Sequence, residues 1–429
     1  MESKKTVTTI VKNQECTGCG TCNTACPFNA ITMCFSSVGR LLPSIDENAC
    51  RNCGVCLKVC PGIDAQQVAT PQDINNPLLG HIKSLYSGRS TDKIIVENAQ
   101  SGGLVTAVLK HLFTENLIDA ALLVGQKDLK ACYFVAKSVG DLGRSQLSQY
   151  TPVDLISGLK YVEAFERVAV VGLPCHIEGV KSLQKAFPHK YENIMYLLGL
   201  ICAGTLSQSL VDIVKKRISG EIERIEWRSK SMSNYNAADI ALYKTEEKSP
   251  VVLSRYLRLS SKPYLTAPRC KLCYDKMNVL ADIVFGDSWG VKGADENGES
   301  VVLCRTEKGC QIIDAMIQQG EVSFRTCSKE EVIKGQGLKG KFESVGKAAA
   351  VYKINGWIVP KWTERFINSD SMDNSILESI INNYVSLDSL HHERVVETLY
   401  TKIINEYMKQ KISSDIKSII YRIYKLIKR

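Results

Sequence analysis

The sequence predicts a small cysteine-rich α+β domain, then an α/β domain, and then a mostly helical C-terminal region. Three observations lead to this prediction. A run of cysteines occurs twice within the first 60 residues, short β-branched runs alternate with helical patterns over residues 81–345, and helical patterns dominate thereafter. At 429 residues, the chain has the length of about three domains.

Composition limits the class of protein further. Hydrophobic residues make up 45% of the chain and charged residues 23%, as in ordinary globular proteins. The apolar runs at 118–125 and 194–203 are far shorter than the roughly 20 residues that cross a bilayer. The first twelve residues lack the pattern of a secretory signal. We therefore expect a cytoplasmic protein, in which 17 cysteines indicate metal binding rather than disulfides.

The net charge of +9 is concentrated at the C-terminal end. From residue 400 onward, eight basic residues outnumber two acidic ones, so this stretch contributes +6 of the total. The rest of the chain is nearly balanced. No nucleic-acid-binding surface is expected from such a distribution.

The expected domain boundaries follow composition. The first domain covers residues 1–62 and a linker covers 63–80, since residues 61–80 contain three prolines, two glycines and little periodicity. The second domain covers 81–345, and the helical region covers 346–429. Within the second domain, the predicted strands are 119–124, 167–171, 195–201, 283–285 and 301–304, and the predicted helices are 103–113, 177–186 and 206–218. This alternation predicts a mainly parallel sheet.

The repeated cysteine run is the most specific signal in the sequence. Each copy reads C-x2-C-x2-C-x3-C-P, and the second copy follows the first at an offset of 34 residues. This is the run of bacterial two-cluster ferredoxins, in which the fourth cysteine of each run binds the other 4Fe-4S cluster. The predicted ligand sets are Cys16, Cys19, Cys22 and Cys60 for one cluster, and Cys50, Cys53, Cys56 and Cys26 for the other. Zinc favours paired C-x2-C sites with longer spacers, so this spacing disfavours it.

A second cysteine set has looser spacing. Cys270 and Cys273 form a C-x2-C pair, while Cys175 and Cys202 each follow a predicted strand. Their positions suggest a third cubane site in the crevice of the sheet, but cysteines after buried strands are also common as small core residues. Spacing alone does not decide between these alternatives. The remaining cysteines are expected to be structural: Cys34, Cys132, Cys304, Cys310 and Cys327.

A glycine turn begins one of the predicted helices. Ser101, Gly102 and Gly103 precede the helix, and Thr106 lies in its first turn. Such a helix start presents free N–H groups to a phosphate or a flavin edge. An ordinary helix cap is the commoner explanation for Ser-Gly-Gly alone.

Together these motifs resemble the coenzyme F420 hydrogenase/dehydrogenase beta-subunit family. The matching segments are Gln100-Ser101-Gly102-Gly103, Ser148-Gln149-Tyr150-Thr151-Pro152, Gly172-Leu173-Pro174-Cys175-His176, Cys270-Lys271-Leu272-Cys273-Tyr274-Asp275, and residues 281–290. With the ferredoxin unit, the resemblance covers about three quarters of the chain. It implies an FAD-binding α/β domain with its own 4Fe-4S cluster.

The resemblance also implies roles for single residues. Cys175, Cys202, Cys270 and Cys273 become ligands of a third 4Fe-4S cluster, and Ser101, Gly102, Gly103 and Thr106 become flavin-side residues. Gln149 is a further cofactor-binding candidate and stands where relatives often carry lysine, and His176 stands where many carry glutamine. His176 is a catalytic candidate because a histidine beside a cluster ligand can move a proton to the flavin; a structural role is the alternative. No G-x-G-x-x-G fingerprint supports a nicotinamide cofactor.

The expected function is an iron–sulfur flavoprotein oxidoreductase that exchanges electrons between FAD and 4Fe-4S clusters. Its partner is expected to be an electron carrier: a ferredoxin, a deazaflavin or a partner redox subunit. The alternative is a non-catalytic electron-transfer subunit whose substrate chemistry lies on another polypeptide. A third hypothesis is a zinc-binding scaffold.

The C-terminal tail predicts a basic amphipathic helix. Isoleucine and leucine recur at helical spacing from residue 412 to residue 427, with six basic residues interleaved or flanking from Lys411 to Arg429. The pattern suits packing on the chain's own domain or on a partner, which we favour, and it also suits peripheral contact with an anionic membrane.

Overall fold

The computed structural model describes residues 6–62, 78–230, 238–245, 247–295, 298–360 and 375–427. The linker predicted at 63–80 lies mostly outside these residues. The first domain contains a hairpin of antiparallel strands flanked by short helices: α1 (Thr8–Lys12), α2 (Thr21–Ala25), β1 (Ile31–Phe35), β2 (Leu41–Ile45) and α3 (Val55–Lys58). This ferredoxin-like α+β arrangement confirms the prediction for the N-terminal part.

Glycines start both helices that follow the cysteine loops. Gly20 precedes α2 with φ 88°, and Gly54 precedes α3 with φ 76°. These values lie in the left-handed region, which a residue with a Cβ adopts only at a cost. The glycines therefore allow each loop to turn sharply into its helix.

The second domain is built on an eight-stranded sheet. The strand order is β13-β3-β12-β11-β7-β6-β4-β5. The bounds are β3 (Ser84–Ser90), β4 (Ala120–Lys127), β5 (Lys130–Ala136), β6 (Val168–Gly172), β7 (Ile194–Leu200), β11 (Ile283–Asp287), β12 (Ser300–Cys304) and β13 (Val322–Thr326). All five strands predicted from the sequence are present in it.

The prediction of a mainly parallel sheet is wrong. Only the central strands β4, β6, β7 and β11 run parallel, while β5 and the group β12, β3 and β13 pair antiparallel at the two sides. The strands β3 and β13 lack the continuous apolar runs of buried parallel strands, which is why the sequence did not indicate them. The strand β5 was missed although residues 131–136 are apolar throughout. The parallel centre still brings four strand carboxyl ends to one edge.

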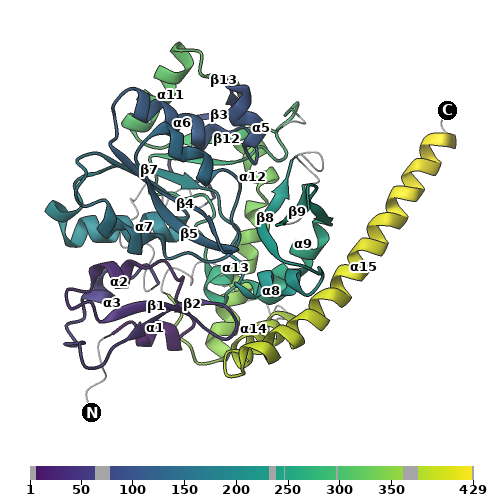
Figure 1. Ribbon diagram of the computed structural model, residues 1–429, viewed down its shortest axis with the longest axis horizontal. Helices are drawn as coiled ribbons and strands as arrows, with labels where there is room; N and C mark the ends of the chain where they lie inside the picture. Colours follow the sequence, from purple (N-terminus) through teal and green to yellow (C-terminus); the bar gives the residue numbers. More distant parts are fainter. Residues whose placement is uncertain are drawn as a thin grey trace.

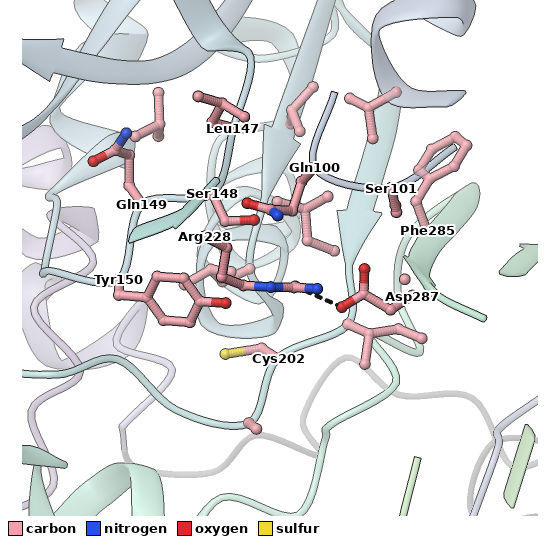
Figure 2. Close-up of a pocket in the computed structure, with 18 of the residues that line it drawn as sticks. Gln100, Ser101, Leu147, Ser148, Gln149, Tyr150, Cys202, Arg228, Phe285 and Asp287 are labelled. Carbon is pink, nitrogen blue, oxygen red and sulfur yellow. Dashed lines mark hydrogen bonds and ion pairs between the residues drawn. The ribbon is translucent and has the colours of Figure 1, made fainter. Parts of the chain in front are cut away.

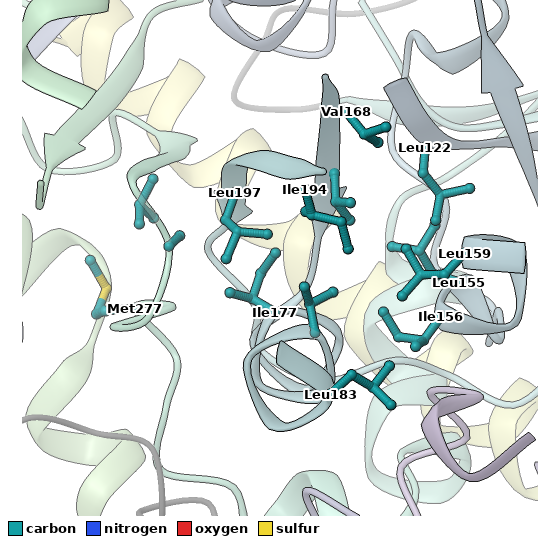
Figure 3. Packing of buried hydrophobic residues seen from close by; sticks show 14 of the residues in the cluster. Leu122, Leu155, Ile156, Leu159, Val168, Ile177, Leu183, Ile194, Leu197 and Met277 are labelled. Atoms are coloured by element: carbon teal, nitrogen blue, oxygen red, sulfur yellow. The ribbon is translucent and has the colours of Figure 1, made fainter. Parts of the chain in front are cut away.

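Helices cover both faces of this sheet (Figure 1). One face packs against α6 (Leu104–Thr114) and α11 (Glu307–Gln318), and the other packs against α7 (Pro174–Ala186) and the 3-10 helix η2 (Leu155–Tyr161). Figure 3 shows the second of these cores, in which Leu122, Ile177 and Leu197 come from a strand, a helix and another strand. Helix α7 begins three residues earlier than predicted, because Pro174 suits the first turn of a helix.

A smaller sheet lies beside the main one and has its own core. It consists of β8 (Ile222–Ser229), β9 (Asp239–Lys244) and β10 (Val251–Leu253), packed with α8 (Ser209–Lys215) and α9 (Tyr256–Leu265). The predicted helix at 206–218 is therefore present but shorter.

The remaining elements are η1 (Val139–Ser145), η3 (Pro188–Lys190), α5 (Lys93–Asn98) and α10 (Pro268–Leu272), followed by α12 (Lys329–Gly335), α13 (Leu338–Ile354), α14 (Ser375–Leu387) and α15 (His392–Ile427).

The ferredoxin-like domain is held on the second domain by hydrogen bonds. The Ile156 N–H donates to the Cys19 carbonyl at 3.0 Å, and the Thr24 hydroxyl donates to the Ile156 carbonyl at 2.7 Å. A Cβ added at Gly179 of α7 would come within 2.2 Å of the Thr21 hydroxyl oxygen, so the two domains are in close contact there. On the opposite side, the Tyr352 hydroxyl donates to the Gln14 carbonyl at 2.7 Å.

The C-terminal part of the described chain is helical, as predicted, and α15 extends away from the body (Figure 1). Among the described residues, no helix is both long enough and apolar enough to cross a membrane.

Leu122→Ala is expected to lower the thermal midpoint of unfolding. Leu122 is fully buried in the core between the sheet and α7, and such truncations cost about 2–5 kcal/mol. Ile94→Ala is the matched control, because the Ile94 side chain is 72% exposed. Differential scanning calorimetry checks the pair, and equal shifts would contradict this assignment of the core.

Candidate functional site

The two ferredoxin-type cysteine runs cross over in space. Cys22 is buried and Cys60 is half-buried, and the thiols of both interact electrostatically with Cys16 and Cys19. The second group lines a small cavity of its own: Cys26, Cys50, Cys53 and Cys56. The fourth cysteine of each run thus lies with the first three of the other, as the predicted ligand sets require.

Backbone N–H groups surround these sulfur atoms. The Ala30 N–H donates to the Cys26 sulfur at 3.3 Å, and the Gly62 N–H donates to the Cys60 sulfur at 3.4 Å. N–H···S bonds of this kind stabilise the negative charge of an iron–sulfur cluster. In the part of the chain that the structure describes, no three His, Cys, Asp or Glu side chains are arranged around a single metal ion.

The looser cysteine set also converges. Cys175, Cys202, Cys270 and Cys273 line one cavity between the sheet edge and α10, together with Thr17 of the ferredoxin-like domain. Cys175 lies in the first turn of α7, Cys202 follows β7, and the other two flank the end of α10. The Gly204 N–H donates to the Cys202 sulfur at 3.3 Å. Four thiols in one cavity favour the third cluster over isolated core cysteines.

Burial raises the pKa of these thiols in the metal-free chain. The pKa of Cys202 rises to about 12 and that of Cys16 to about 11, and burial places the pKa of Cys175 well above its usual range. Neighbouring cysteines contribute in the same direction at Cys175, with Cys19 of the other domain among them. Iron binding therefore has to release these protons, which couples cluster insertion to folding.

A buried arginine lies between two of the cysteine sites. Arg269 directly precedes Cys270, is 3% exposed, and donates to the Pro61 carbonyl at 3.4 Å, next to Cys60. Burial raises the pKa of Cys16, Cys60 and Cys273, and the positive charge of Arg269 counteracts this rise at all three. The arginine therefore offers charge compensation to both sites at once.

A large cavity lies at the carboxyl ends of the parallel strands. Its volume is about 350 Å³, within the range of ligand pockets. The residues at or next to the ends of three strands line it: Val171 and Gly172 of β6, Leu200 and Ile201 at β7, and Phe285, Gly286 and Asp287 of β11. In open α/β sheets, ligands bind outside this edge.

This cavity shares a wall with the third cysteine site. The residues that line both are Val153, Leu173, His176, Cys202, Gly204 and Thr205. Cys202 is thus at once a candidate cluster ligand and part of the lining of the large cavity. A group bound in the cavity would therefore be separated from the cluster site only by these shared residues.

Most of the flavin-side residues predicted from the sequence line the cavity. Ser101, Gly103, Thr106 and Gln149 belong to its lining, whereas Gly102 does not. A Cβ at Gly102 would come within 2.5 Å of the Gly88 carbonyl oxygen, so this glycine is required for packing against the sheet. Gly103 has φ 74° and caps α6, and a Cβ there would meet Ile95 rather than the cavity.

His176 is held by backbone groups on both ring nitrogens. Its Nδ1 accepts from the Leu173 N–H at 3.3 Å, and its Nε2–H donates to the Val153 carbonyl at 3.2 Å. Burial lowers the pKa of His176 to about 4, so the ring is neutral near pH 7. This geometry favours the structural alternative over proton transfer.

The sequence did not indicate the basic residues of the cavity. Arg228 of β8 and Arg258 and Lys262 of α9 reach the cavity from the smaller sheet and its helix, and Lys276 joins them. Arg228 forms an ion pair with Asp287 at 2.7 Å (Figure 2). Burial lowers the pKa of Arg258 and of Lys262, and the neighbouring positive charges add to this effect. The wall therefore carries more positive than negative charge.

Polar atoms in the cavity also lack partners within the protein. Both side-chain polar atoms of Gln100 and the Thr151 hydroxyl are buried and have no hydrogen bond among the described residues. Figure 2 shows the Gln100 amide directed into the same space as Ser148 and Arg228. Buried polar groups normally have partners. A flavin dinucleotide, with a polar ring edge and a negatively charged pyrophosphate, fits both the unpaired polar atoms and the positive wall.

The chain matches three known families in order. Residues 15–62 match the 4Fe-4S dicluster domain, residues 85–160 match the N-terminal part of the coenzyme F420 hydrogenase/dehydrogenase beta subunit, and residues 165–330 match its C-terminal part. The two beta-subunit matches together span more than half of the chain.

Several curated relatives are similar over most of the chain. The coenzyme F420-dependent sulfite reductase of Methanocaldococcus jannaschii is 28% identical over 78% of the chain, and the chain spans only 51% of that protein. The F420H2 dehydrogenase of Methanosarcina mazei has a subunit that is 25% identical over 73% of the chain and 85% of its own length. The beta subunit of the coenzyme F420 hydrogenase of Methanosarcina barkeri is 27% identical over 62% of the chain and 89% of its own length.

A solved structure shares the fold. A chain of the F420-reducing [NiFe] hydrogenase complex from Methanosarcina barkeri superposes with a TM-score of 0.53 at 21% identity, covering 69% of this chain and 100% of the other.

Cys273→Ser is expected to remove about four of roughly twelve irons per chain, since each cubane holds four. The spectra of the ferredoxin-like domain should persist, because its thiols belong to other sites. Iron analysis and electron paramagnetic resonance of anaerobically purified protein check this. The control is Cys327→Ser, at a half-buried cysteine outside the three cysteine sites. Loss of all iron in the first variant, or of four irons in the control, would contradict the ligand assignment.

Proposed function

The chain belongs to the coenzyme F420 hydrogenase/dehydrogenase beta-subunit family, and from this premise we propose that it is a flavin-containing iron–sulfur oxidoreductase. Its FAD would occupy the large cavity, and Cys175, Cys202, Cys270 and Cys273 would hold the third 4Fe-4S cluster. The hydride carrier would be a deazaflavin, since the relatives named above are dependent on, or reduce, coenzyme F420.

The observation that carries this proposal is the wall that the cavity and the third cysteine site share. Electron transfer between two centres requires that they lie close together, and Cys202 lines both spaces. FAD, when bound, supplies the exchange between two-electron hydride chemistry and one-electron transfer. The protein's contribution would be to hold FAD beside a cluster, in a space lined by buried and half-buried residues.

Different residues around the cavity would bind different parts of the FAD. Arg258 and Lys262 would neutralise the pyrophosphate, while Gln100 and Thr151 would bond to polar edges of the flavin. Arg228 is oriented by its ion pair with Asp287 and borders the same space. Gln149 carries no charge, and its side chain accepts a hydrogen bond from Gln126 at 3.0 Å.

The cysteine sites would then form a path away from the flavin. The third site touches the ferredoxin-like domain at Thr17, next to Cys16, and Cys19 is near enough to influence Cys175 electrostatically. The second ferredoxin-type site lies beyond the first, and its Cys53 is exposed. A one-electron carrier, or a partner redox subunit, would exchange electrons there.

Turnover of a reduced deazaflavin tests the proposal. Anaerobically purified protein with intact flavin and iron is expected to oxidise reduced coenzyme F420 with a viologen dye as the one-electron acceptor. Absence of turnover, with flavin and iron contents intact, would favour the alternative of an electron-transfer subunit that acts only with a catalytic partner. Two of the relatives named above are subunits of larger enzymes, which supports that alternative.

Lys262→Gln is expected to reduce the flavin content without destabilising the flavin-free protein. Burial and the charges of Arg258 and Arg228 lower the pKa of Lys262, so its positive charge costs stability at neutral pH unless an anion binds. Released flavin is measured by absorbance, and thermal melting is measured on flavin-free protein. Lys353→Gln, at an exposed position of α13, is the control. Full flavin content in the Lys262 variant would contradict the anion-binding role.

Arg269→Gln is expected to shift the reduction potentials of the two clusters beside it to more negative values. A buried positive charge stabilises the reduced cluster, which carries one more negative charge. Arg269→Lys retains the charge and should restore most of the shift. Redox titration followed by electron paramagnetic resonance measures this, with the cluster of Cys26, Cys50, Cys53 and Cys56 as the internal reference. A uniform shift of all three clusters would contradict a local effect.

A further inference from the structure

The long C-terminal helix changes its apolar face partway along its length. Its first part packs on α8 and α9 through four buried residues, which are Val395, Leu399, Ile403 and Tyr407. Beyond these, Met408, Ile412 and Ile416 are 45%, 54% and 51% exposed. The helix thus leaves its own core near residue 407 but continues to carry large apolar side chains.

The two apolar faces point in nearly opposite directions. At 3.6 residues per turn, the centre of the buried face and the centre of the exposed face are separated by about 160° around the helix. The positions that continue the buried side are polar, with Gln410 and then Ser414, whose hydroxyl accepts a hydrogen bond from the Tyr256 hydroxyl at 2.9 Å. Among the described residues, the exposed side chains of Met408, Ile412 and Ile416 therefore form a separate face, the distal apolar face, which does not pack on the core of the chain. The packing on the own domain that the sequence suggested is therefore not seen for Met408, Ile412 and Ile416, while docking on a partner stays untested.

The sequence extends the distal face to the end of the helix. At 3.6 residues per turn, the methionine, isoleucine and leucine positions from Met408 to Ile427 fall within an arc of about 120°: Met408, Ile412, Ile416, Ile419, Ile420, Ile423, Leu426 and Ile427. Four of the five basic positions up to Ile427 fall outside that arc, as do the two tyrosines, and Asp415 is the one acidic residue. A narrow apolar arc with a basic remainder is the pattern of a helix that lies in a membrane interface.

Charge distinguishes between the surfaces that could cover this face. From Met408 onward, seven basic residues and one acidic residue give each copy a net charge of +6. A second copy of the helix would place this charge against an equal one in either orientation, which opposes association. An anionic lipid surface offers the opposite charge over an extended area.

We propose that residues 408–427 bind the surface of an anionic membrane as an interfacial helix. The position of the globular body is compatible with a helix that lies flat on the membrane. Since the buried face of the first part and the exposed face of the second part lie on opposite sides of the helix, the globular body would sit on the side away from the lipid. Figure 1 shows that α15 runs along the outside of the body and projects past it. This proposal is independent of the redox proposal, because no residue of the cavity or of the cysteine sites belongs to this segment.

Vesicle co-sedimentation of the full-length protein tests the proposal. With vesicles of phosphatidylcholine containing about one third phosphatidylglycerol, the protein is expected to pellet at low salt and to be released several-fold at high salt, where surface charges are screened. Vesicles of phosphatidylcholine alone should bind at least tenfold less. Protein truncated after Tyr407 should not pellet, while its flavin and iron contents remain unchanged.

Two double variants distinguish binding through inserted apolar side chains from binding through charge alone. Ile412→Glu with Ile416→Glu places two carboxylates on the apolar arc and should lower vesicle binding at least tenfold. Ser413→Glu with Ser418→Glu adds the same charge outside the arc and should lower it only a few-fold. Circular dichroism and thermal melting establish that each variant is folded.

Two results would overturn the proposal. One is absence of pelleting of folded full-length protein with anionic vesicles at low salt. The other is equal loss of binding in the two double variants, which would indicate adsorption through charge alone. Light scattering without lipid identifies self-association; a dimer that the isoleucine variants abolish would assign the face to a second copy instead.

Discussion

The parallel direction of β4, β6, β7 and β11 is the constraint on which the candidate site depends. Parallel strands end at the same edge, so segments that are far apart in the chain deliver their next residues to one place. Cys175 comes just after β6 and Cys202 just after β7, and both reach the site through this geometry. Of the antiparallel strands at either side, β12 begins at this edge with Ser300, which also lines the cavity.

Charge balance explains how so many thiols and basic groups are buried close together. Ionised groups in a protein interior are costly unless opposite charges compensate them. The cysteine sites would carry negative charge when loaded with iron, and Arg269 lies between two of them. The cavity wall carries the excess positive charge of Arg258 and Lys262, which an anionic cofactor would balance. In the bare protein each site thus has an excess of positive charge, and its expected occupant would supply the balancing negative charge.

The sequence indicated the cysteine sites better than the cavity, for a physical reason. Cluster ligands in the ferredoxin-like domain are close in the chain because one loop wraps one cluster, so their spacing is visible. The strands β4, β6, β7, β11 and β12 were also visible as continuous apolar runs. By contrast, Arg228, Arg258 and Lys262 come from the smaller sheet and its helix, where no spacing relates them to the glycine turn. The i, i+4 placement of Arg258 and Lys262 on one face of α9 was the single local signal.

The roles of glycine and histidine in the motifs also depend on packing that the sequence does not display. Gly102 and Gly103 stand in a turn that resembles a phosphate-binding loop, yet their missing side chains make room for Gly88 and Ile95. His176 stands beside a cluster ligand, yet both of its nitrogens bond to the backbone of residues 153 and 173. By ordering these two segments, which line both spaces, the histidine would keep the wall between cavity and cluster site rigid. A rigid wall fixes the distance between two redox centres, and that distance governs electron transfer even when no residue of the wall takes part in the chemistry.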